Sequence, residues 1–411
     1  MHLKERCGES IMKYIIVLGD GMADEPIPAL GGKTPLECAN TPAMDLLSKK
    51  GELGMVHTIP EGMAPGSDTA NLSVLGYDPL IYYSGRSPLE ALSIGVPMKD
   101  DDIALRCNVV TISEEETEFE NRTILDHSSG EISTQDAAVL IEVIKKELAK
   151  EGYSFYPGTS YRHCLIWEKG QVVELTPPHD VLEQKIGQYL PADAVLRDMM
   201  KKSYDILKDH PINLKRKEQG LNPANCIWFW GAGTKPMLSN FYEKTGKKGI
   251  MISAVDLLKG IAVGAGMDNA YVEGANGGLH TNYEGKMQAA VDALVKEDYD
   301  FAYIHVEAPD EMGHQGSADR KVEAIEYLDQ KIIGPLVKNL EDNNIDFRLL
   351  VLPDHPTPVR VRTHTAGDVP YLLYDSTLAI EASWSYNETD ALKSGNMMEE
   401  GHRLIDKLFE R

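Results

Sequence analysis

The chain has 411 residues, 42% of them hydrophobic, so it can bury a large core, and its length predicts two domains. Its net charge of −23 disfavours nucleic acid as a partner, because the phosphate backbone is also negative. The longest apolar runs have the length of a strand, so no membrane helix is expected, and the N-terminus lacks the apolar core of a signal peptide. The five cysteines are scattered without a CxxC spacing, which indicates free thiols in a reducing cytoplasm rather than disulfides or a thiolate zinc site.

Strand-sized apolar runs alternate with helical patterns along most of the chain, which predicts an α/β fold. Residues 1–12 are polar, and we expect a disordered lead there, or an artefact of an upstream start. A buried strand is expected at 14–19, and a short helix at 41–51 with Thr41 as its N-cap and Pro42 in its first turn. Further strands are expected at 226–233, 248–255, 299–309 and 347–355, with helices at 286–297 and 318–342.

The middle of the chain has a different pattern. Residues 101–126 suggest paired strands, 134–150 a helix, and 161–178 a β-hairpin that turns at Lys169–Gly170. We therefore predict a smaller α+β domain at 100–190, inserted into a discontinuous core domain formed by 13–99 and 191–411. The core is expected to resume at 191–230 with a helix and an apolar strand.

Candidate ligands for a divalent metal follow three of the predicted strands. Asp20 follows the strand at 14–19, Asp310 follows the apolar run that ends at 309, and Asp354 follows the run at 347–353. Open α/β sheets bind ligands beyond the carboxyl ends of their strands, so these motifs are expected to meet there. A strand-end aspartate is also a common turn residue, so no single motif carries this prediction.

Histidines accompany two of these carboxylates. His314 lies four residues after Asp310, so a helix would place both on one face, although a neighbouring proline and glycine favour a turn. His355 is adjacent to Asp354, and His364 follows nine residues later. A solvated acidic loop and a surface histidine are the alternative interpretations. As a set, the mixed oxygen and nitrogen ligands suit Mn²⁺ or Zn²⁺, and the lack of thiolates disfavours a structural zinc.

Ser67 lies where a helix is expected to begin, directly after Gly66. Serine is a favoured N-cap, so a purely structural role is the alternative. The N–H groups at a helix start also stabilise anions, and the Ser67 hydroxyl could carry a phosphate. No histidine base is near in sequence, so a metal would have to lower the pKa of this hydroxyl. A dinucleotide site is disfavoured, because the GAG sequences at 231–233 and 264–266 both lack the third glycine at the required spacing, and no Walker A sequence occurs.

Four motifs carry a family resemblance: GDGMAD at 19–24, GSDTANLSVLGYDP at 66–79, EAPDEMGH at 307–314 and LPDHPTP at 352–358. With these and further motifs in order from about residue 13 onward, the chain resembles the cofactor-independent phosphoglycerate mutases of the archaeal type, within the alkaline phosphatase superfamily. The resemblance implies an alkaline-phosphatase-like core sheet with helices on both faces, plus the inserted α+β domain as a cap over the substrate. It also implies a cytoplasmic isomerase of glycolysis and gluconeogenesis that acts on a small phosphorylated molecule.

Residue by residue, the resemblance implies one metal held by Asp20, Ser67, Asp354 and His355, and a second held by Asp310, His314 and His364. Ser67 would be the nucleophile that forms a phosphoserine while 3-phosphoglycerate and 2-phosphoglycerate interconvert. Two divalent ions are expected, Mn²⁺ or Zn²⁺ before Mg²⁺ or Co²⁺, and the sequence sets no oligomeric state.

Cationic side chains must hold the phosphate and carboxylate of such a substrate against the negative net charge. The candidates are Arg86, Arg106, Arg162, His163 and Lys235, whereas His179 and His280 receive no role.

A related metallophosphatase, or a phosphomutase of another small metabolite, is the alternative activity. A non-catalytic metal- or metabolite-binding protein is the alternative class.

Overall fold

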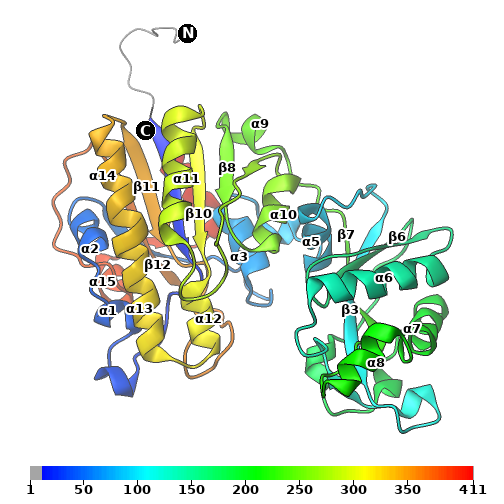
Figure 1. Cartoon of the computed structure of the whole chain (residues 1–411). Coiled ribbons are helices and arrows are strands. Elements are labelled where there is room, and N and C mark those ends of the chain that lie inside the picture. Colours follow the sequence, from blue (N-terminus) through cyan, green and yellow to red (C-terminus); the bar gives the residue numbers. More distant parts are fainter. Residues whose placement is uncertain (1–11, 411) are drawn as a thin grey trace. The chain divides into compact units, whose positions relative to one another are not determined.

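The computed structural model describes residues 12–410, so the expected lead lies outside the described residues except for Met12. The chain forms two compact units (Figure 1). Unit 1 takes the described residues up to Tyr83 and those from Leu238 onward, and unit 2 is Ser84–Met237. The boundaries of the inserted unit are thus wider than the predicted 100 and 190, because 191–237 packs within unit 2 and not within the core. No helix among residues 12–410 combines the length and the apolar composition needed to cross a membrane.

Unit 1 is built on an eight-stranded sheet with the order β13-β2-β12-β11-β1-β10-β8-β9. Its centre is parallel, since β1 pairs with β10 and β11, and β10 pairs with β8. β12 is antiparallel to both of its neighbours, β11 and β2. The strands are β1 (Lys13–Gly19), β2 (Glu52–Val56), β8 (Gly249–Ile252), β9 (Asp268–Asn269), β10 (Phe301–Val306), β11 (Phe347–Leu352), β12 (Val369–Asp375) and β13 (Met397–Met398).

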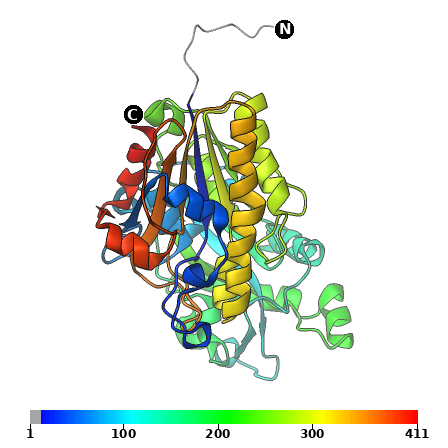
Figure 2. The ribbon, with the colours of Figure 1, turned by 90° about the vertical axis from the view of Figure 1, so that its left-hand side faces the viewer.

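Helices cover both faces of this sheet, as the sequence predicts (Figures 1 and 2). On one face Ile15 and Val17 of β1 share a core with α11, α13 and α14. On the other face Tyr303 of β10 contacts α3, and Tyr14 meets Phe409 of α16 edge to face at 5.0 Å. The helices of unit 1 are α1 (Pro35–Cys38), α2 (Pro42–Ser48), α3 (Ser67–Val74), α4 (Pro79–Tyr82), α9 (Phe241–Thr245), α10 (Asp256–Gly264), α11 (Tyr283–Lys296), α12 (Ala308–His314), α13 (Ala318–Leu328), α14 (Gly334–Asp342), α15 (Glu388–Ser394) and α16 (Leu404–Phe409).

The long helix expected at 318–342 is α13 and α14, joined by a π-helical turn at Asp329–Ile333. Within that turn the buried Asp329 carboxylate accepts the N–H groups of Ala43 (3.1 Å) and Met44 (2.7 Å). These N–H groups open α2 and have no partner inside that helix. Thr41 does lie at the N-cap position, but its side chain makes no capping bond, so a residue far away in sequence replaces it.

The register of the central strands brings their carboxyl ends to one edge. Gly19 pairs with Val306, and Leu18 pairs with Leu352, so the loops after β1, β10 and β11 begin side by side. α12 follows β10 almost directly, with Pro309 in its first turn, where a missing N–H costs nothing. The turn that Pro309 and Gly313 favoured in the sequence is therefore wrong, because this segment forms a helix.

Unit 2 contains a five-stranded sheet in the order β4-β3-β6-β5, with β7 pairing with β3, and all of these pairings are antiparallel. The strands are β3 (Ile103–Ile112), β4 (Ile124–Asp126), β5 (Tyr153–Tyr156), β6 (Arg162–Trp167) and β7 (Cys226–Thr234). The helices are α5 (Arg86–Ser93), α6 (Thr134–Leu148), α7 (Ala194–Leu207) and α8 (Pro211–Glu218). The unit is thus the α+β type that the sequence predicts.

Two predictions for this region are wrong. The apolar strand at 226–230 is not part of the core sheet, because β7 pairs with β3 of unit 2 along most of its length. The hairpin across Lys169–Gly170 does not form either. β6 pairs with β3 and β5, which use both of its edges, and 171–177 forms no strand. The apolar pattern locates β6 and β7 correctly but does not identify the strands with which they pair.

Candidate functional site

One nitrogen of the His355 ring in unit 1, Nε2, lies close to both Asp20 and Ser67. Ser67 Oγ lies 3.1 Å from His355 Nε2, and Asp20 Oδ1 lies 3.5 Å from the same nitrogen. Asp20 follows β1 and is 3% exposed, and its Oδ1 atom is buried without a hydrogen-bond partner. Its other oxygen, Oδ2, lies 3.0 Å from Nε2 of His305. Oδ2 of Asp20 is therefore engaged by His305, and Oδ1 is presented to His355.

Asp354 holds the loops around this group together. Its Oδ1 accepts the backbone N–H groups of Gly21 (3.0 Å) and His355 (2.9 Å). Its Oδ2 accepts from the side-chain amide of Asn71 (2.9 Å) and lies 3.4 Å from His355 Nε2. The same amide nitrogen donates to the carbonyl of Ser67 (2.8 Å). Asp354 thus ties the start of α3, the loop after β1 and the loop after β11 to one another.

Ser67 is the first residue of α3, and Gly66 occupies the N-cap position. The alternative interpretation of Ser67 as a helix cap is therefore wrong, because its hydroxyl does not close the helix. The helix start is fixed through the Ser67 carbonyl instead, since Asn71 donates to it and also accepts from Tyr303 Oη (2.6 Å). The hydroxyl remains directed at His355.

Asp310, His314 and His364 form the second group. His314 Nε2 lies 3.1 Å from Asp310 Oδ2, and His364 Nε2 lies 3.5 Å from Asp310 Oδ1. The two imidazole nitrogens are 3.1 Å apart, although they belong to α12 and to the loop after β11. Thr357 Oγ1 donates to Asp310 Oδ1 (2.5 Å) and lies 3.2 Å from His355 Nδ1, so it connects this group with the first one.

Two sets of ligand atoms have the spacing of metal sites. Those of Asp310, His314 and His364 lie within 4.8 Å of one another, and so do those of Asp20, Asp310 and His355. The first set is the one that the resemblance assigns to the second metal. The other unites Asp20 with His355 as expected, but with Asp310 where the resemblance has Asp354. Asp310 therefore belongs to both sets.

The electrostatics of the groups fit bound cations. Burial, together with the charges of Asp354 and Asp310, raises the pKa of Asp20 well above its ordinary value. Burial lowers the pKa of His355, whereas hydrogen bonding to Asp310 raises the pKa of His314 to about 9. Buried carboxylates this close together repel one another unless positive charge lies between them. The unpartnered Oδ1 of Asp20 and the oxygen and nitrogen donor set therefore fit divalent metals.

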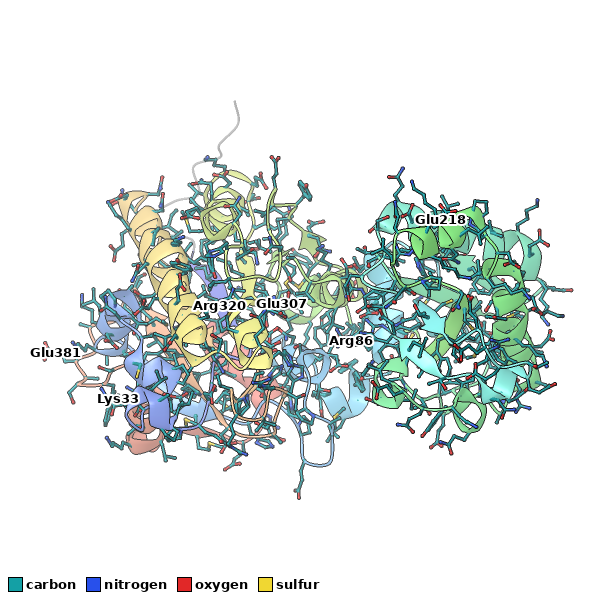
Figure 3. The ribbon with its side chains drawn as sticks, turned by 60° about the horizontal axis from the view of Figure 1, so that its bottom comes forward. Lys33, Arg86, Glu218, Glu307, Arg320 and Glu381 are labelled. Atoms are coloured by element: carbon teal, nitrogen blue, oxygen red, sulfur yellow. The ribbon has the colours of Figure 1, made fainter. Side chains whose placement is uncertain are left out.

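The sequence did not predict four residues of this site: Asn71, His305, Tyr303 and Thr357. Only His305 gave a usable signal, because a histidine within the apolar strand YIHV must have a buried partner. Glu307, which leads from β10 into α12, is labelled in Figure 3, and its charge also raises the pKa of Asp20.

The candidates for substrate binding all belong to unit 2, and two of them, Arg86 and Arg106, bind the Glu90 carboxylate. Arg106 is 9% exposed, donates through Nε and Nη2 to the Glu90 carboxylate (both 2.5 Å), and stacks on Trp230 at 4.4 Å. Arg86, at the start of α5, donates to the same carboxylate at 3.0 Å (Figure 3). Arg162 is exposed beside Tyr161, and the positive charges of Arg86 and Arg162 both act on Arg106. We call Arg86, Arg106 and Arg162 the arginine cluster.

His163 and Lys235 lie apart from the arginine cluster. His163 pairs in register with Cys107, on the face of the sheet that packs under α6 and α7, and burial lowers its pKa to about 3. It is therefore neutral and cannot supply the positive charge predicted for it. Lys235 makes an ion pair with Asp100 at 3.0 Å. His179, which received no role from the sequence, does lie near the cluster, with its ring 5.3 Å from that of Trp230.

A serine at a helix start beside two sets of metal ligands, on a mostly parallel sheet, defines a candidate phosphoryl-transfer site. The family model described as 2,3-bisphosphoglycerate-independent phosphoglycerate mutase matches residues 48–213. A curated protein of that name from Methanosarcina barkeri is 49% identical over 94% of this chain and 96% of its own length. A protein from Geobacter sulfurreducens with the name prefixed "probable" is 45% identical over 97% of this chain and 100% of its own.

Solved structures agree with these relatives. The PH0037 protein from Pyrococcus horikoshii is 30% identical, with a TM-score of 0.80 over 97% of both chains. A cofactor-independent phosphoglycerate mutase from Thermoplasma acidophilum is 25% identical, with a TM-score of 0.65 over 97% of this chain and 98% of its own. The chain therefore belongs to the 2,3-bisphosphoglycerate-independent phosphoglycerate mutases, and the family predicted from the motifs is confirmed.

Proposed function

We propose that the protein interconverts 3-phosphoglycerate and 2-phosphoglycerate through a phosphoserine at Ser67. Membership of the mutase family supports the reaction. The observation that supports the nucleophile is the position of Ser67 Oγ, 3.1 Å from His355 Nε2 and outside the hydrogen bonds that fix its helix. Thr357 also lies between the two ligand sets, but its hydroxyl already donates to Asp310.

Asp20, Ser67, Asp354 and His355 would hold one divalent ion, and Asp310, His314 and His364 the other; Asp310 belongs to both sets of closely spaced ligand atoms. Bound ions would lower the pKa of the Ser67 hydroxyl and offset the negative charge of the transferring phosphoryl group. Mn²⁺ and Zn²⁺ suit this mixture of oxygen and nitrogen donors best, and Mg²⁺ and Co²⁺ are the other candidates.

The reaction would run in two half-steps. Ser67 Oγ bonds to the phosphorus of 3-phosphoglycerate, the bond from phosphorus to the C3 oxygen breaks, and the proton lost from Ser67 ends on that oxygen. Glycerate then presents its C2 hydroxyl, whose oxygen takes the phosphoryl group while its proton returns to Ser67. The two half-steps balance, so the enzyme returns to its starting state.

We further propose that unit 2 acts as the substrate cap and that its arginine cluster binds the anionic groups of glycerate and phosphate. Guanidinium groups suit bidentate contacts with such oxyanions. Glycerate must also stay bound, and water must be kept from the phosphoserine between the half-steps, because hydrolysis of the phosphoserine would turn the mutase into a phosphatase. The reducing cytoplasm is our proposed location, in keeping with the four cysteines among residues 12–410, which are all free thiols.

The test is the conversion of 3-phosphoglycerate by the purified protein, measured by coupling 2-phosphoglycerate to enolase, with free phosphate measured in parallel. We expect conversion without added bisphosphoglycerate, loss of conversion in EDTA, and recovery on addition of Mn²⁺. Steady release of phosphate in place of 2-phosphoglycerate would instead establish a metallophosphatase. Metal binding without any turnover would overturn both activities.

A further inference from the structure

His305 is a histidine in the interior of the protein whose ring faces the metal-ligand groups. It is fully buried in β10 and pairs in register with Leu18, two residues before Asp20. Its Nε2 lies 3.0 Å from Asp20 Oδ2. None of the roles proposed above uses this histidine.

The other contacts of His305 decide which ring nitrogen carries the proton. Ser253 Oγ lies 3.3 Å from Nδ1 and accepts the backbone N–H of Val255 at 3.0 Å. A hydroxyl that accepts one bond still has its own proton to donate, and Nδ1 is within its reach. With Nδ1 as acceptor, Nε2 carries the ring N–H and donates it to Asp20. The backbone of His305 is fixed as well, because Lys286 Nζ donates to its carbonyl at 2.9 Å.

The two oxygens of Asp20 thereby have different roles. Oδ2 accepts the hydrogen bond from the ring N–H of His305, whereas Oδ1 has no hydrogen-bond partner and lies 3.5 Å from His355 Nε2. An aspartate without such a partner could rotate about its terminal torsion, which has broad energy minima, and exchange its oxygens. The contact with His305 removes this freedom.

We propose that His305 is a positioning residue that holds Asp20 Oδ2, so that Oδ1 is presented as the ligand of a divalent metal. This inference rests on the proposed function, because it takes Asp20 to be a metal ligand. Groups that hydrogen-bond to a metal ligand orient it, and their removal usually costs about 10- to 100-fold in metal affinity. His305, with Ser253 behind it, has that role here.

The experiment is a titration of the metal-stripped protein with Mn²⁺, followed by calorimetry, without substrate. His305→Phe keeps a ring but has no N–H, and we expect its affinity for Mn²⁺ to fall by about 10- to 100-fold. His305→Gln can place an amide N–H near the position of Nε2, so it should recover much of that loss. Wild-type affinity in His305→Phe, or equal losses in both variants, would overturn the proposal.

A matched control is Phe301→Leu, which alters another buried side chain on the same face of β10 without a contact to Asp20. It should lower the melting temperature and leave Mn²⁺ affinity unchanged. Where His305→Phe does not fold, Ser253→Ala replaces it: a weakened affinity supports the proposal, and wild-type affinity overturns it. This titration needs no turnover. A failure of the mutase assay would therefore refute the proposed function, whereas the effect of His305 on Mn²⁺ affinity would still be measurable.

Discussion

Ser67 and His355 are 288 residues apart in sequence, yet Ser67 Oγ lies 3.1 Å from His355 Nε2. The backbone of both residues is fixed by Asp354, through Asn71 on the serine side and through the His355 N–H on the other. The distance between the proposed nucleophile Ser67 and the proposed metal ligand His355 is therefore set by one buried carboxylate. That arrangement suits a reaction in which the serine oxygen must reach phosphorus twice in each turnover.

Ser67→Ala should abolish the interconversion of the phosphoglycerates. Loss of a nucleophile typically costs on the order of 10³-fold or more in kcat, and alanine leaves the carbonyl that accepts from Asn71 in place. The measurement is the enolase-coupled rate, together with the intact mass of protein quenched during turnover. Wild-type protein should show the mass of one added phosphoryl group, and the variant should not. Substantial activity in Ser67→Ala would exclude the phosphoserine.

Arg162→Ala should weaken substrate binding more than it changes the metal site. Arg106 is already engaged by Glu90 and Trp230, whereas Arg162 is exposed in the same cluster. A hydrogen bond to a charged group contributes about 1.5–3 kcal/mol, so kcat/KM for 3-phosphoglycerate should fall by about 10- to 100-fold. Mn²⁺ affinity should stay as in the wild type.

The matched control for this prediction is Arg197→Ala. Arg197 is an exposed arginine of the same unit, and its guanidinium donates to the carbonyls of Pro191 and Ala192 on the surface. We expect its kcat/KM to stay near the wild-type value. Equal losses in both variants would show that the net charge of unit 2, and not the arginine cluster, governs substrate binding.

The sequence predicts the core of unit 1 well because its signals are local. Buried parallel strands are continuous apolar runs, and the residue after each run lies at the ligand-binding edge, which is how Asp20 and Asp354 could be found. His305 escaped the prediction because its function depends on the residue across the strand pair, and a single sequence does not give that register. Asn71 and Thr357 were not predicted because each also bonds a residue far away in sequence, Asp354 and Asp310 respectively.

The sequence predicts unit 2 less well because its sheet is antiparallel and its strands pair out of order. β7 joins β3 from more than a hundred residues away, and no turn signal connects the two strands. Turn chemistry at Lys169–Gly170 predicts a local hairpin, and Lys169 does adopt a positive φ of 49°, but the chain after it does not pair back. His163 was a candidate only by its residue type, and the sequence does not show that it pairs with Cys107 on the buried face of the sheet, where one residue of register reverses the direction of a side chain.

Lys321→Met should destabilise unit 1. Lys321 Nζ is fully buried and donates to Asp24 Oδ2 (2.8 Å), to the carbonyl of Ala23 (3.1 Å) and to that of Thr357 (2.9 Å). Removal of one partner leaves the Asp24 carboxylate buried without its counter-charge, which costs about 3–5 kcal/mol. The measurement is thermal unfolding of the metal-stripped protein. Because Lys321 joins the loops after β1 and β11, Mn²⁺ affinity should fall as well.

Lys338→Met is the matched control for this destabilisation. Lys338 makes a similarly short ion pair, 2.6 Å to Asp342, but both side chains are exposed on α14. Solvent screens exposed pairs of this kind, so they contribute little to stability, and the melting temperature of the variant should stay near that of the wild type. Equal destabilisation by the two substitutions would contradict the role assigned to Lys321.

Glu388 gives unit 1 a specific dependence on pH. Burial raises the pKa of Glu388 from its ordinary value of 4.5 to about 7, although its oxygens accept from Thr34 Oγ1 (2.7 Å) and the Asp24 N–H (3.2 Å). Between these two values the folded protein binds more protons at Glu388 than the unfolded chain does. This contribution to stability is therefore fully present below about pH 4.5 and is lost as pH rises through about 7.

Glu388→Gln should remove that loss, because an amide does not ionise. Thermal unfolding at about pH 5 and about pH 8 should give a smaller difference in melting temperature for the variant than for the wild type. Glu381→Gln, at an exposed glutamate before α15 (Figure 3), is the matched control and should keep the wild-type difference. If Glu388→Gln also keeps the wild-type difference in melting temperature, Glu388 is ionised in the folded protein across this pH range. The contacts with Thr34 and Asp24 would then outweigh its burial.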